Sequence, residues 1–585
     1  MNTPKLELLL SAICVLRAAP PGYTDPSACR PCHLETYDRY LATPMGRSFP
    51  DPAKAAAQAQ WNNASFVHPA SGDRYEMFQR EGAYFVRRYR FEDGKRAHVL
   101  ERRVTHIMGS GEHALSLLHQ TAEGRLYELP VSWYTQERAW AMAPGYDRPN
   151  HPGFSRQVNH KCMFCHNAYP DVPPERSRAG WDADVIWPRT LPVGIDCQRC
   201  HGPGEKHAST RAAADIVNPA KLSPERSLET CMQCHYETTT FHLPASLRRF
   251  QRPFYSFRPG EPLSDYMVHF DHAAGSGREG KFEIVSAAYR LRQSQCFLKS
   301  GKMTCLTCHD PHARPQPAER AAHYRNRCRT CHVSVKARDH NTATDCIGCH
   351  MPTRRTEDVV HVTMTDHKIA RRPPAGDLVA PRKEKEEQYR GEVVQVYPKP
   401  ASRDDVYQAV AQVRDRSNLS AGVARLEAAL QTSPSTSPEP WFELAEALRA
   451  VSRARDAEAA YRRAVAADAN FPQAWNNLAN LLADSGRRRE AVEAFRRALT
   501  LTPWDAEVQV NLGLTLLEAG DTDGALRRFR SAIAANPDHA SGHANLGALL
   551  LGLGRTEEAR RAFATAIALD PDHELARKNL SKLRE

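Results

Sequence analysis

Alternation of apolar and polar residues marks one part of the N-terminal half of the chain. Residues 74–104 alternate in this way, with breaks at Gly82 and at Asp93 and Gly94. Alternation is typical of half-buried β-strands, and glycine at such breaks favours tight turns. The pattern predicts two or three antiparallel strands with a hairpin, continued by residues 125–134. We expect a small β-rich insert, at about residues 61–135, with a structural role.

A different pattern governs the C-terminal part, where residue types recur every 34 positions. The recurring positions are Gly486, Gly520 and Gly554; Tyr461, Phe495, Phe529 and Phe563; Ala464, Ala498, Ala532 and Ala566; Asn477, Asn511, Asn545 and Asn579; and Pro503, Pro537 and Pro571. This period resembles the tetratricopeptide repeat, a helix–turn–helix unit of about 34 residues. The phase predicts four repeats at about residues 438–573, a degenerate helix pair before them at 404–432, and a capping helix after them at 574–585.

Repeats of this kind stack into a solenoid whose curved groove holds peptides or partner proteins. The resemblance therefore implies a protein or peptide partner at the repeat groove, an inference by analogy of fold. We place the repeat domain at residues 402–585. Its histidines, His539, His543 and His573, are interpreted as surface residues and not as ligands.

Two segments flank the part of the chain that precedes the repeats. Residues 370–401 are rich in proline and charge, with little helical or strand pattern, and are interpreted as a linker. Residues 1–22 combine Lys5 with a short apolar run and resemble a secretory signal, although Glu7 and Arg17 depart from that pattern. No segment has 18 consecutive apolar residues, so we expect no transmembrane segment.

The strongest chemical signal is a short motif that occurs seven times. Fourteen of the 16 cysteines fall into units of the form CxxCH, and only Cys14 and Cys296 lie outside them. Numbered 1 to 7 in chain order, the motifs are Cys29, Cys32 and His33; Cys162, Cys165 and His166; Cys197, Cys200 and His201; Cys231, Cys234 and His235; Cys305, Cys308 and His309; Cys328, Cys331 and His332; and Cys346, Cys349 and His350.

Covalent attachment of c-type haem accounts for every position of this motif. Zinc sites need four ligands per ion, without a histidine in a fixed next position. A thioredoxin-type thiol pair needs one motif, and a disulfide framework needs no histidine. In c-type haem, two thiols bind the vinyl groups of the porphyrin and the adjacent histidine binds the iron. The sequence therefore predicts seven covalently attached haems, and with them a periplasmic or extracellular location.

Each iron also needs a ligand on its far side. A histidine there gives a saturated carrier of low potential, a methionine raises the potential, and an open position permits chemistry. Residues 1–370 hold 23 histidines, enough for bis-histidine ligation throughout. His207 and His312 follow motifs 3 and 5 too closely to reach the far face of the same iron, so each is expected to serve a neighbouring haem. The candidate distal ligands are His68, His113, His151, His207, His272, His312 and His367, with His340 and His361 as rivals of His367 and Met45 as the one methionine considered.

Residues 25–370 resemble the cytochrome c-554/c-552-like multihaem proteins. The resemblance is carried by CRPCH followed by TPMGRS, by GSGEHALSLL, LPVSWY, CHGPGEKH and TCHDPH, and by CIGCHMP with TDHKI. It implies haems that stack in close pairs and pass electrons, in a group where some members act on small nitrogen or sulfur compounds. All seven motifs end in histidine, so the lysine-ligated catalytic haem of many relatives of pentahaem nitrite reductase is absent.

Composition narrows the choice of function. The chain of 585 residues is long enough for two or three domains, and its net charge of +11 is spread along the sequence. The absence of an arginine–lysine block with interleaved aromatics argues against nucleic acid as a partner.

The sequence predicts a mainly α protein in two parts. A heptahaem cytochrome c domain at residues 23–369, with little regular structure and a small β insert, precedes an α-solenoid of tetratricopeptide repeats. We expect an exported electron carrier with a redox partner protein. The alternative is an oxidoreductase that acts on a small nitrogen or sulfur compound at one open haem. A non-redox assembly protein ranks last, because a single haem would serve that purpose. Which distal histidine meets which iron stays open.

Overall fold

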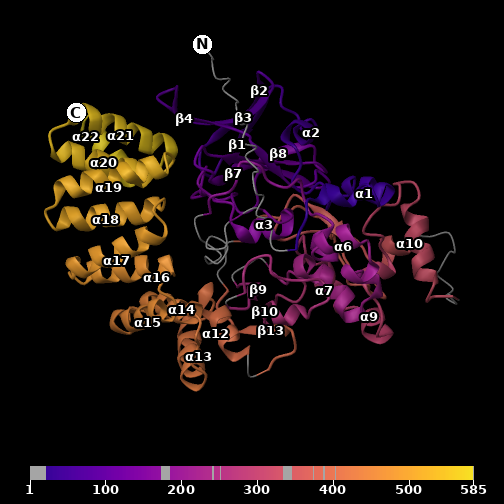
Figure 1. Ribbon diagram of the computed structural model, residues 1–585. Helices are drawn as coiled ribbons and strands as arrows, with labels where there is room; N and C mark the ends of the chain where they lie inside the picture. Colours follow the sequence, from indigo (N-terminus) through magenta and orange to yellow (C-terminus); the bar gives the residue numbers. More distant parts are fainter. Residues whose placement is uncertain are drawn as a thin grey trace, which may run out of the picture.

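The computed structural model describes residues 22–170, 172, 185–239, 243–250, 252–333, 345–372, 374–385, 389–401 and 404–583. All of the expected signal segment except Gly22 lies outside these residues, as do Cys14 and the rival ligand His340. In Figure 1 the C-terminal helices stack in a column beside an N-terminal part that holds the strands and many short helices. None of the helices in the described ranges is long and apolar enough to cross a membrane.

The β insert is larger than the alternation predicts. It consists of two four-stranded antiparallel sheets, in the orders β1-β2-β3-β4 and β5-β6-β7-β8, and it extends to residue 142. The strands are β1 (Ala64–Val67), β2 (Arg74–Arg80), β3 (Ala83–Glu92), β4 (Lys95–Arg103), β5 (His106–Met108), β6 (Ala114–Gln120), β7 (Leu126–Tyr134) and β8 (Ala139–Met142). Residues 74–104 form the antiparallel strands β2, β3 and β4, which confirms the expectation of two or three strands there, and β7 covers the expected continuation at residues 125–134. Strands β1, β5, β6 and β8 lie outside the predicted segments.

The breaks in the alternating pattern are the hairpin turns. Glu81 and Gly82 join β2 to β3 with φ of 51° and 77°, and Asp93 and Gly94 join β3 to β4 with φ of 49° and 73°. Positive φ at both turn residues matches the right-handed twist of the flanking strands, and glycine adopts it without steric cost. The alternation thus predicts both turns correctly. Met77 and Val86, which face each other across β2 and β3, are 0% exposed and enter the core of the insert.

The motifs lie on short helices. The elements that carry them are η1 (Pro26–Cys29), α3 (His160–His166), α5 (Gln198–His201), α7 (Pro224–His235), η5 (Cys305–Thr307), α10 (Arg320–Arg329) and α11 (Cys346–His350). Between them lie α1 (Leu34–Leu41), α2 (Pro52–Ala56), α6 (Glu205–Thr210), η2 (Ala213–Asp215), η3 (Pro219–Lys221), η4 (Leu263–Asp265), α8 (Ala287–Arg292) and α9 (Gln295–Ser300). This part of the chain therefore has short elements joined by long irregular segments.

The segment expected to be a linker takes part in the fold. Its residues form β13 (Val393–Tyr397), which pairs with β10 (Met267–His272), and β10 in turn pairs with β9 (Ser246–Arg248). Glu384 accepts hydrogen bonds from the backbone of Gly145, at 2.6 Å, and of Asp147, at 3.2 Å. The expectation of a segment without strand structure is corrected here, because β13 gains its pairing from a strand more than a hundred residues earlier. A further pair, β11 (Thr353–Arg355) and β12 (Thr363–Thr365), follows motif 7.

The C-terminal part is the helical solenoid that the 34-residue period predicts. The degenerate pair is α12 (Asp405–Arg414) and α13 (Leu419–Thr432); the four repeats are α14 (Pro438–Ala450) with α15 (Ala454–Ala467), α16 (Pro472–Asp484) with α17 (Arg488–Leu501), α18 (Ala506–Glu518) with α19 (Thr522–Ala535), and α20 (Ala540–Gly552) with α21 (Thr556–Leu569); and the cap is α22 (Glu574–Lys582). The recurring glycines Gly486, Gly520 and Gly554 have φ of 75°, 85° and 74° and turn the chain between the two helices of a repeat. The recurring aromatic side chains are all 0% exposed.

One apolar core joins the two parts of the chain. Leu247, Val268 and Val393 of the β9–β10–β13 sheet belong to the same buried cluster as Val410 of α12 and Leu426 of α13. This cluster continues through the first repeats. Phe250 stacks on Tyr407 at a ring-centre distance of 4.2 Å. The start of the solenoid is therefore fixed to the N-terminal part by packing.

Candidate haem-ligand site

Each motif folds so that its three functional side chains share one helical turn. The histidine N–H donates to the carbonyl of the first cysteine in motif 1 (His33 to Cys29, 3.1 Å), motif 3 (His201 to Cys197, 2.9 Å), motif 5 (His309 to Cys305, 2.9 Å) and motif 6 (His332 to Cys328, 3.0 Å). Residues three and four apart lie on one face of a helical turn. The two thiols and the imidazole therefore project from the same face, as attachment to one porphyrin requires.

The thiols of different motifs lie close to one another. The thiol of Cys29 lies near that of Cys197, Cys165 near Cys234, Cys231 near Cys305, and Cys328 near Cys346. Motif 1 thus lies against motif 3, motif 4 against motifs 2 and 5, and motif 6 against motif 7. The cysteines in the described ranges are free thiols. The fold therefore gathers the motifs into clusters and leaves their sulfur atoms available for covalent bonds.

Three motif histidines face a candidate distal histidine. The ring centres of His33 and His207 are 6.2 Å apart, with 24° between the ring planes. Those of His201 and His312 are 5.9 Å apart at 20°, and those of His309 and His367 are 6.1 Å apart at 34°. A metal ion bound to two opposed imidazole nitrogens, at about 2 Å from each, places the ring centres roughly 6 Å apart. All three pairs have the separation that an iron with two axial histidines needs.

The second ring nitrogen of several of these histidines is held by the backbone. The Nδ1 atoms of His201, His207 and His350 lie 2.8, 2.9 and 2.8 Å from the carbonyls of Val217, Ala212 and Ala370. A carbonyl only accepts, so each Nδ1 carries the hydrogen and Nε2 keeps its lone pair. Histidines that bind metals almost always make this second contact, which fixes the ring orientation.

Burial keeps the deeper histidines neutral. It lowers the pKa of His166 to about 4, and the pKa of His367 is lowered to about 4 by burial and then by the nearby His309. Burial, followed by the neighbouring His309, also lowers the pKa of His235. A neutral imidazole is the form that binds a metal ion. Within the described residues, no group of three or more His, Cys, Asp or Glu side chains is placed to hold an ion.

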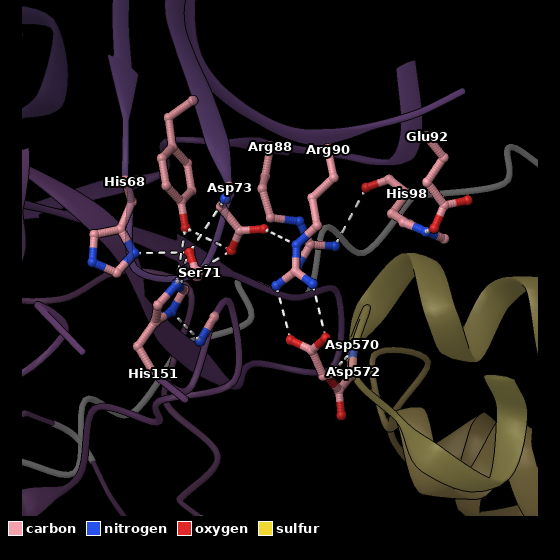
Figure 2. Close-up of polar contacts among 12 residues, drawn as sticks. His68, Ser71, Asp73, Arg88, Arg90, Glu92, His98, His151, Asp570 and Asp572 are labelled. Atoms are coloured by element: carbon pink, nitrogen blue, oxygen red, sulfur yellow. Dashed lines mark hydrogen bonds and ion pairs between the residues drawn. The ribbon is translucent and has the colours of Figure 1, made fainter. Parts of the chain in front are cut away.

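His68 and His151 make other contacts in this structure, and neither faces a motif histidine in the contacts described above. His68 places Nδ1 2.8 Å from Ser71 Oγ and Nε2 3.2 Å from Asp147 Oδ1. His151 places Nε2 3.2 Å from Asp73 Oδ2, and its Nδ1 accepts from the Gly153 N–H at 3.1 Å. Figure 2 shows this group of polar side chains in the β insert. Both nitrogens of each ring have partners, so an axial role for either histidine would require one of these contacts to break.

Two other candidates occupy environments of their own. His272, on β10, packs edge-on against Tyr389 at a ring-centre distance of 4.3 Å, and Lys281 Nζ lies 3.1 Å from its Nδ1. His113 precedes β6, and its Nδ1 is buried without a hydrogen-bond partner. Of the rivals, His361 has Nδ1 2.8 Å from Glu137 Oε2. For His113 and His272 an axial role stays a prediction.

The sequence did not single out His269. This residue is 3% exposed on β10, and its Nδ1 has no hydrogen-bond partner. Its ring meets Tyr236, which directly follows motif 4, at 4.9 Å. Burial lowers the pKa of His269 to about 3, so it is neutral. In the sequence it lies three residues from His272 in an apolar run, and no local signal separates the two.

Comparisons with known proteins identify parts of both halves. A model described as a doubled CXXCH motif matches residues 298–337, which contain motifs 5 and 6. Two models described as tetratricopeptide repeat match residues 470–538 and 516–583. The chain therefore contains tetratricopeptide repeats and a doubled motif typical of c-type haem binding. No curated protein matches the chain. The likeness to the cytochrome c-554/c-552-like group stays a prediction.

Several solved structures are similar to about a third of the chain. One, described as MamA, is 20% identical over 28% of this chain and 95% of its own, with a TM-score of 0.26. YrrB, described as a TPR protein with an unusual peptide-binding site, is 21% identical over 32% of this chain and 94% of its own, with a TM-score of 0.28. PilF of Pseudomonas aeruginosa is 23% identical over 31% of this chain and 88% of its own, with a TM-score of 0.27.

Proposed function

We propose that this chain is an exported heptahaem c-type cytochrome that transfers electrons along a chain of haems and docks to protein partners through its repeat domain. The observation that carries the proposal is the set of three facing histidine pairs. Each pair joins a motif histidine to a histidine that follows a later motif. Each pair would hold one iron between two imidazoles, and an iron held in this way serves as an electron carrier with no open position.

The residues of the seven motifs fit the haem. The two thiols of each motif would hold the porphyrin and the motif histidine would hold the iron, with His207, His312 and His367 as far-side ligands in three cases. Haem, when bound, supplies a one-electron iron couple whose potential the axial ligands and burial set. This chain's residues orient the imidazoles through the backbone contacts of His201, His207 and His350.

The arrangement of the motifs supports transfer between haems. Motif 3 is linked to motif 1 by Cys197 and Cys29, and motif 5 reaches motif 3 through His312. Motif 4 lies near motifs 2 and 5, and motif 7 supplies the segment that carries His367. Neighbouring motifs in space thus lie close together, which suits short steps for an electron.

The ends of this arrangement are open to solvent. Cys32 and His33 of motif 1 are exposed, as are Cys331 of motif 6 and Cys349 of motif 7, whereas Met163 and Phe164 of motif 2 are buried. An exposed haem edge is needed for exchange with a redox partner protein. We infer that electrons enter and leave near motif 1 and near motifs 6 and 7.

The test combines mass and absorption measurements on the mature protein from the periplasm. Mass spectrometry should find seven haems on the fourteen motif thiols and an N-terminus near residue 22. The absorption spectrum should be low-spin and unchanged by nitrite, hydroxylamine or carbon monoxide. A high-spin band that shifts with these ligands would favour an oxidoreductase with one open haem, and a mass without added haem would overturn the proposal.

A pair of variants then tests the axial assignment. His207→Ala should convert one haem from low-spin to high-spin and make it bind carbon monoxide, because it removes the ligand that faces His33. His151→Ala is the matched control, because both ring nitrogens of His151 already have partners, Asp73 and the Gly153 N–H. It should leave the haem spectrum unchanged. A high-spin band in the control, or its absence in H207A, would refute the assignment.

A further inference from the structure

The last repeats present the same kind of hydrogen-bond acceptor at intervals of one repeat. Helix α19 ends at Ala535 and α21 ends at Leu569, and an aspartate follows each end, Asp538 and Asp572. The last carbonyls of a helix lack partners within the helix and carry the negative end of its dipole. Each of these turns is therefore a site that favours a positively charged donor.

Four arginines of the β insert fill these sites. Arg125 donates to the carbonyls of Ala535 and, at 2.6 Å, of Trp504. Arg88 donates to the carbonyl of Ala568. Arg102 donates to Asp538 at 2.6 Å, and Arg90 makes two bonds of 2.8 Å with Asp572. We call these four arginines, with their acceptors on the repeats, the arginine clamp.

The clamp is firmly anchored on the side of the β insert. Arg88 and Arg125 are each 1% exposed. Arg90 also donates to Asp73 at 2.6 Å, and Asp73 is in turn held by His151 at 3.2 Å. Figure 2 shows Asp73 between His151 and Arg90, with Arg90 facing Asp572 of the last repeat turn. Asp73 of the β insert thus helps to orient Arg90 toward the repeats.

Polar contacts dominate this junction. A cavity of about 470 Å³ lies within it, lined by the four arginines and by acidic residues of the repeats. Leu569 is the repeat residue that packs against the apolar cluster of the β insert. The junction at the start of the solenoid is different. There one apolar core includes residues of both the N-terminal part and the first helices of the solenoid. The clamp can therefore open without exposing a large apolar surface.

The clamp lies at the turns between repeats, beside the first residues of α18 and α20, and the other junction lies against α14. These three are the first helices of their repeats, and stacked repeats form a concave binding surface, here called the inner face. Glu507 of α18 and Ser541 of α20 line the clamp cavity. At the other end, Phe442 and Glu446 of α14 line a cavity of about 300 Å³ together with Phe250 of the N-terminal part. The N-terminal part thus contacts first helices of the repeats near both ends of the solenoid.

We propose that the inner face of the solenoid is occupied in cis by the N-terminal part of the same chain, and that the arginine clamp is a latch that closes this face to external partners. The proposal rests on the docking role proposed for the repeats and refines it. The occupant is the β insert, through Arg88, Arg90, Arg102 and Arg125. A partner would reach the inner face only after the latch opens.

The experiment uses the full-length, haem-loaded protein. In the variant R90A/R102A, the backbone amides of residues 535–541 and 569–573 should exchange hydrogen about tenfold faster, and small-angle scattering should show a larger radius. The control variant R462A/R496A removes two exposed arginines, one on α15 and one on α17. They occupy the same position in successive repeats, and the clamp contains neither of them. It should change neither measurement.

A second variant changes the residues of the repeats that bind the clamp arginines. D538N/D572N removes two negative charges that face Arg102 and Arg90, without altering the β insert, and it should give the same faster exchange. Unchanged exchange and radius in both variants, or scattering from the wild type that requires separated domains, would overturn the latch. Haem content measured on the same samples reports separately on the proposed cytochrome, since the clamp contains no motif residue.

Discussion

The repeat half and the motif half of this molecule differ in what fills the space between their elements. In the repeat half, the side chains at recurring positions are fully buried against one another: Phe495, Phe529 and Phe563 are each 0% exposed. In the motif half, the most distinctive side chains face one another across gaps, as His33 and His207 do at 6.2 Å. The repeat half is closed by its own core, whereas the motif half brings histidines together at separations of about 6 Å that suit an iron between them.

This difference teaches that a repeated sequence pattern can have two physical meanings. The 34-residue period arises from packing, because each repeat buries side chains at the same positions against its neighbours. The CxxCH motif reflects cofactor chemistry, because it places two thiols and an imidazole on one helical turn. It does not determine which residues pack around them. The first pattern predicts a fold, and the second predicts a cofactor. Four changes can break or sharpen the comparison.

The largest expected effect follows removal of the haem. If the chain is produced where c-type haem is not attached, the motif half should lose its order, because its histidine pairs and free thiols then have nothing to bind. The repeat half should keep its helices. Limited proteolysis with mass spectrometry should show rapid cleavage within residues 22–370 and resistance within residues 438–583. Equal resistance of both halves would mean that the motif half folds on its own side chains.

Truncating a repeat aromatic tests the core of the other half. Phe529→Ala should lower the free energy of unfolding of the repeats by about 3–5 kcal/mol, the usual cost of a buried phenylalanine. Denaturant unfolding followed by helical circular dichroism measures it. Leu553→Ala, at a side chain 46% exposed, is the control and should cost less than about 0.5 kcal/mol. Similar costs at both positions would contradict a core built from the recurring positions.

Acid should weaken the boundary between the halves. Burial raises the pKa of Asp73, but hydrogen bonds from His151 and Arg90 outweigh it and hold the pKa well below the usual value. The Arg90 guanidinium, against the smaller opposing effect of burial, lowers the pKa of Asp572. Carboxylates with depressed pKa stabilise the fold above their unfolded-state value, about 3.9 for aspartate, and this contribution is lost as the pH falls further.

Hydrogen exchange at residues 569–573 should therefore be slow at pH 5 and above, after correction for the intrinsic rate, and should rise below about pH 4. The variant Asp73→Asn should remove most of this dependence and cost about 1.5–3 kcal/mol, the range for a hydrogen bond to a charged group. Exchange in the wild type that does not respond to acid would show that the clamp carries little of the boundary.

The smallest expected effect lies in a repeat turn. Gly520 has φ of 85°, a region that costs a residue with a side chain about 1–2 kcal/mol. Gly520→Ala should lower the unfolding free energy of the repeats by that amount, as measured by thermal unfolding. Gly552→Ala is the control, because Gly552 lies within α20 and a Cβ there meets open space. It should be neutral or slightly stabilising.

The site was predictable in its parts but not in its assembly. Motif spacing identifies the cysteines and the seven motif histidines, because a helical turn alone brings them together. Of the candidate distal ligands, His207, His312 and His367 meet motif histidines. His68 instead contacts Ser71 and Asp147, and His151 contacts Asp73. Nothing local in the sequence separates these two outcomes, because any histidine beside a polar turn can satisfy both nitrogens there.

The sequence by itself determined what depends on neighbours along the chain: the hairpin turns at Gly82 and Gly94, the helix pairs of the repeats, and the haem motifs. These follow from backbone conformation and from residues within one or two turns of each other. Only the tertiary structure decided the pairing of histidines, the strand β13 within the expected linker, and the arginine clamp. Each of these joins segments that are remote in sequence, and their partners are set by how the whole chain packs.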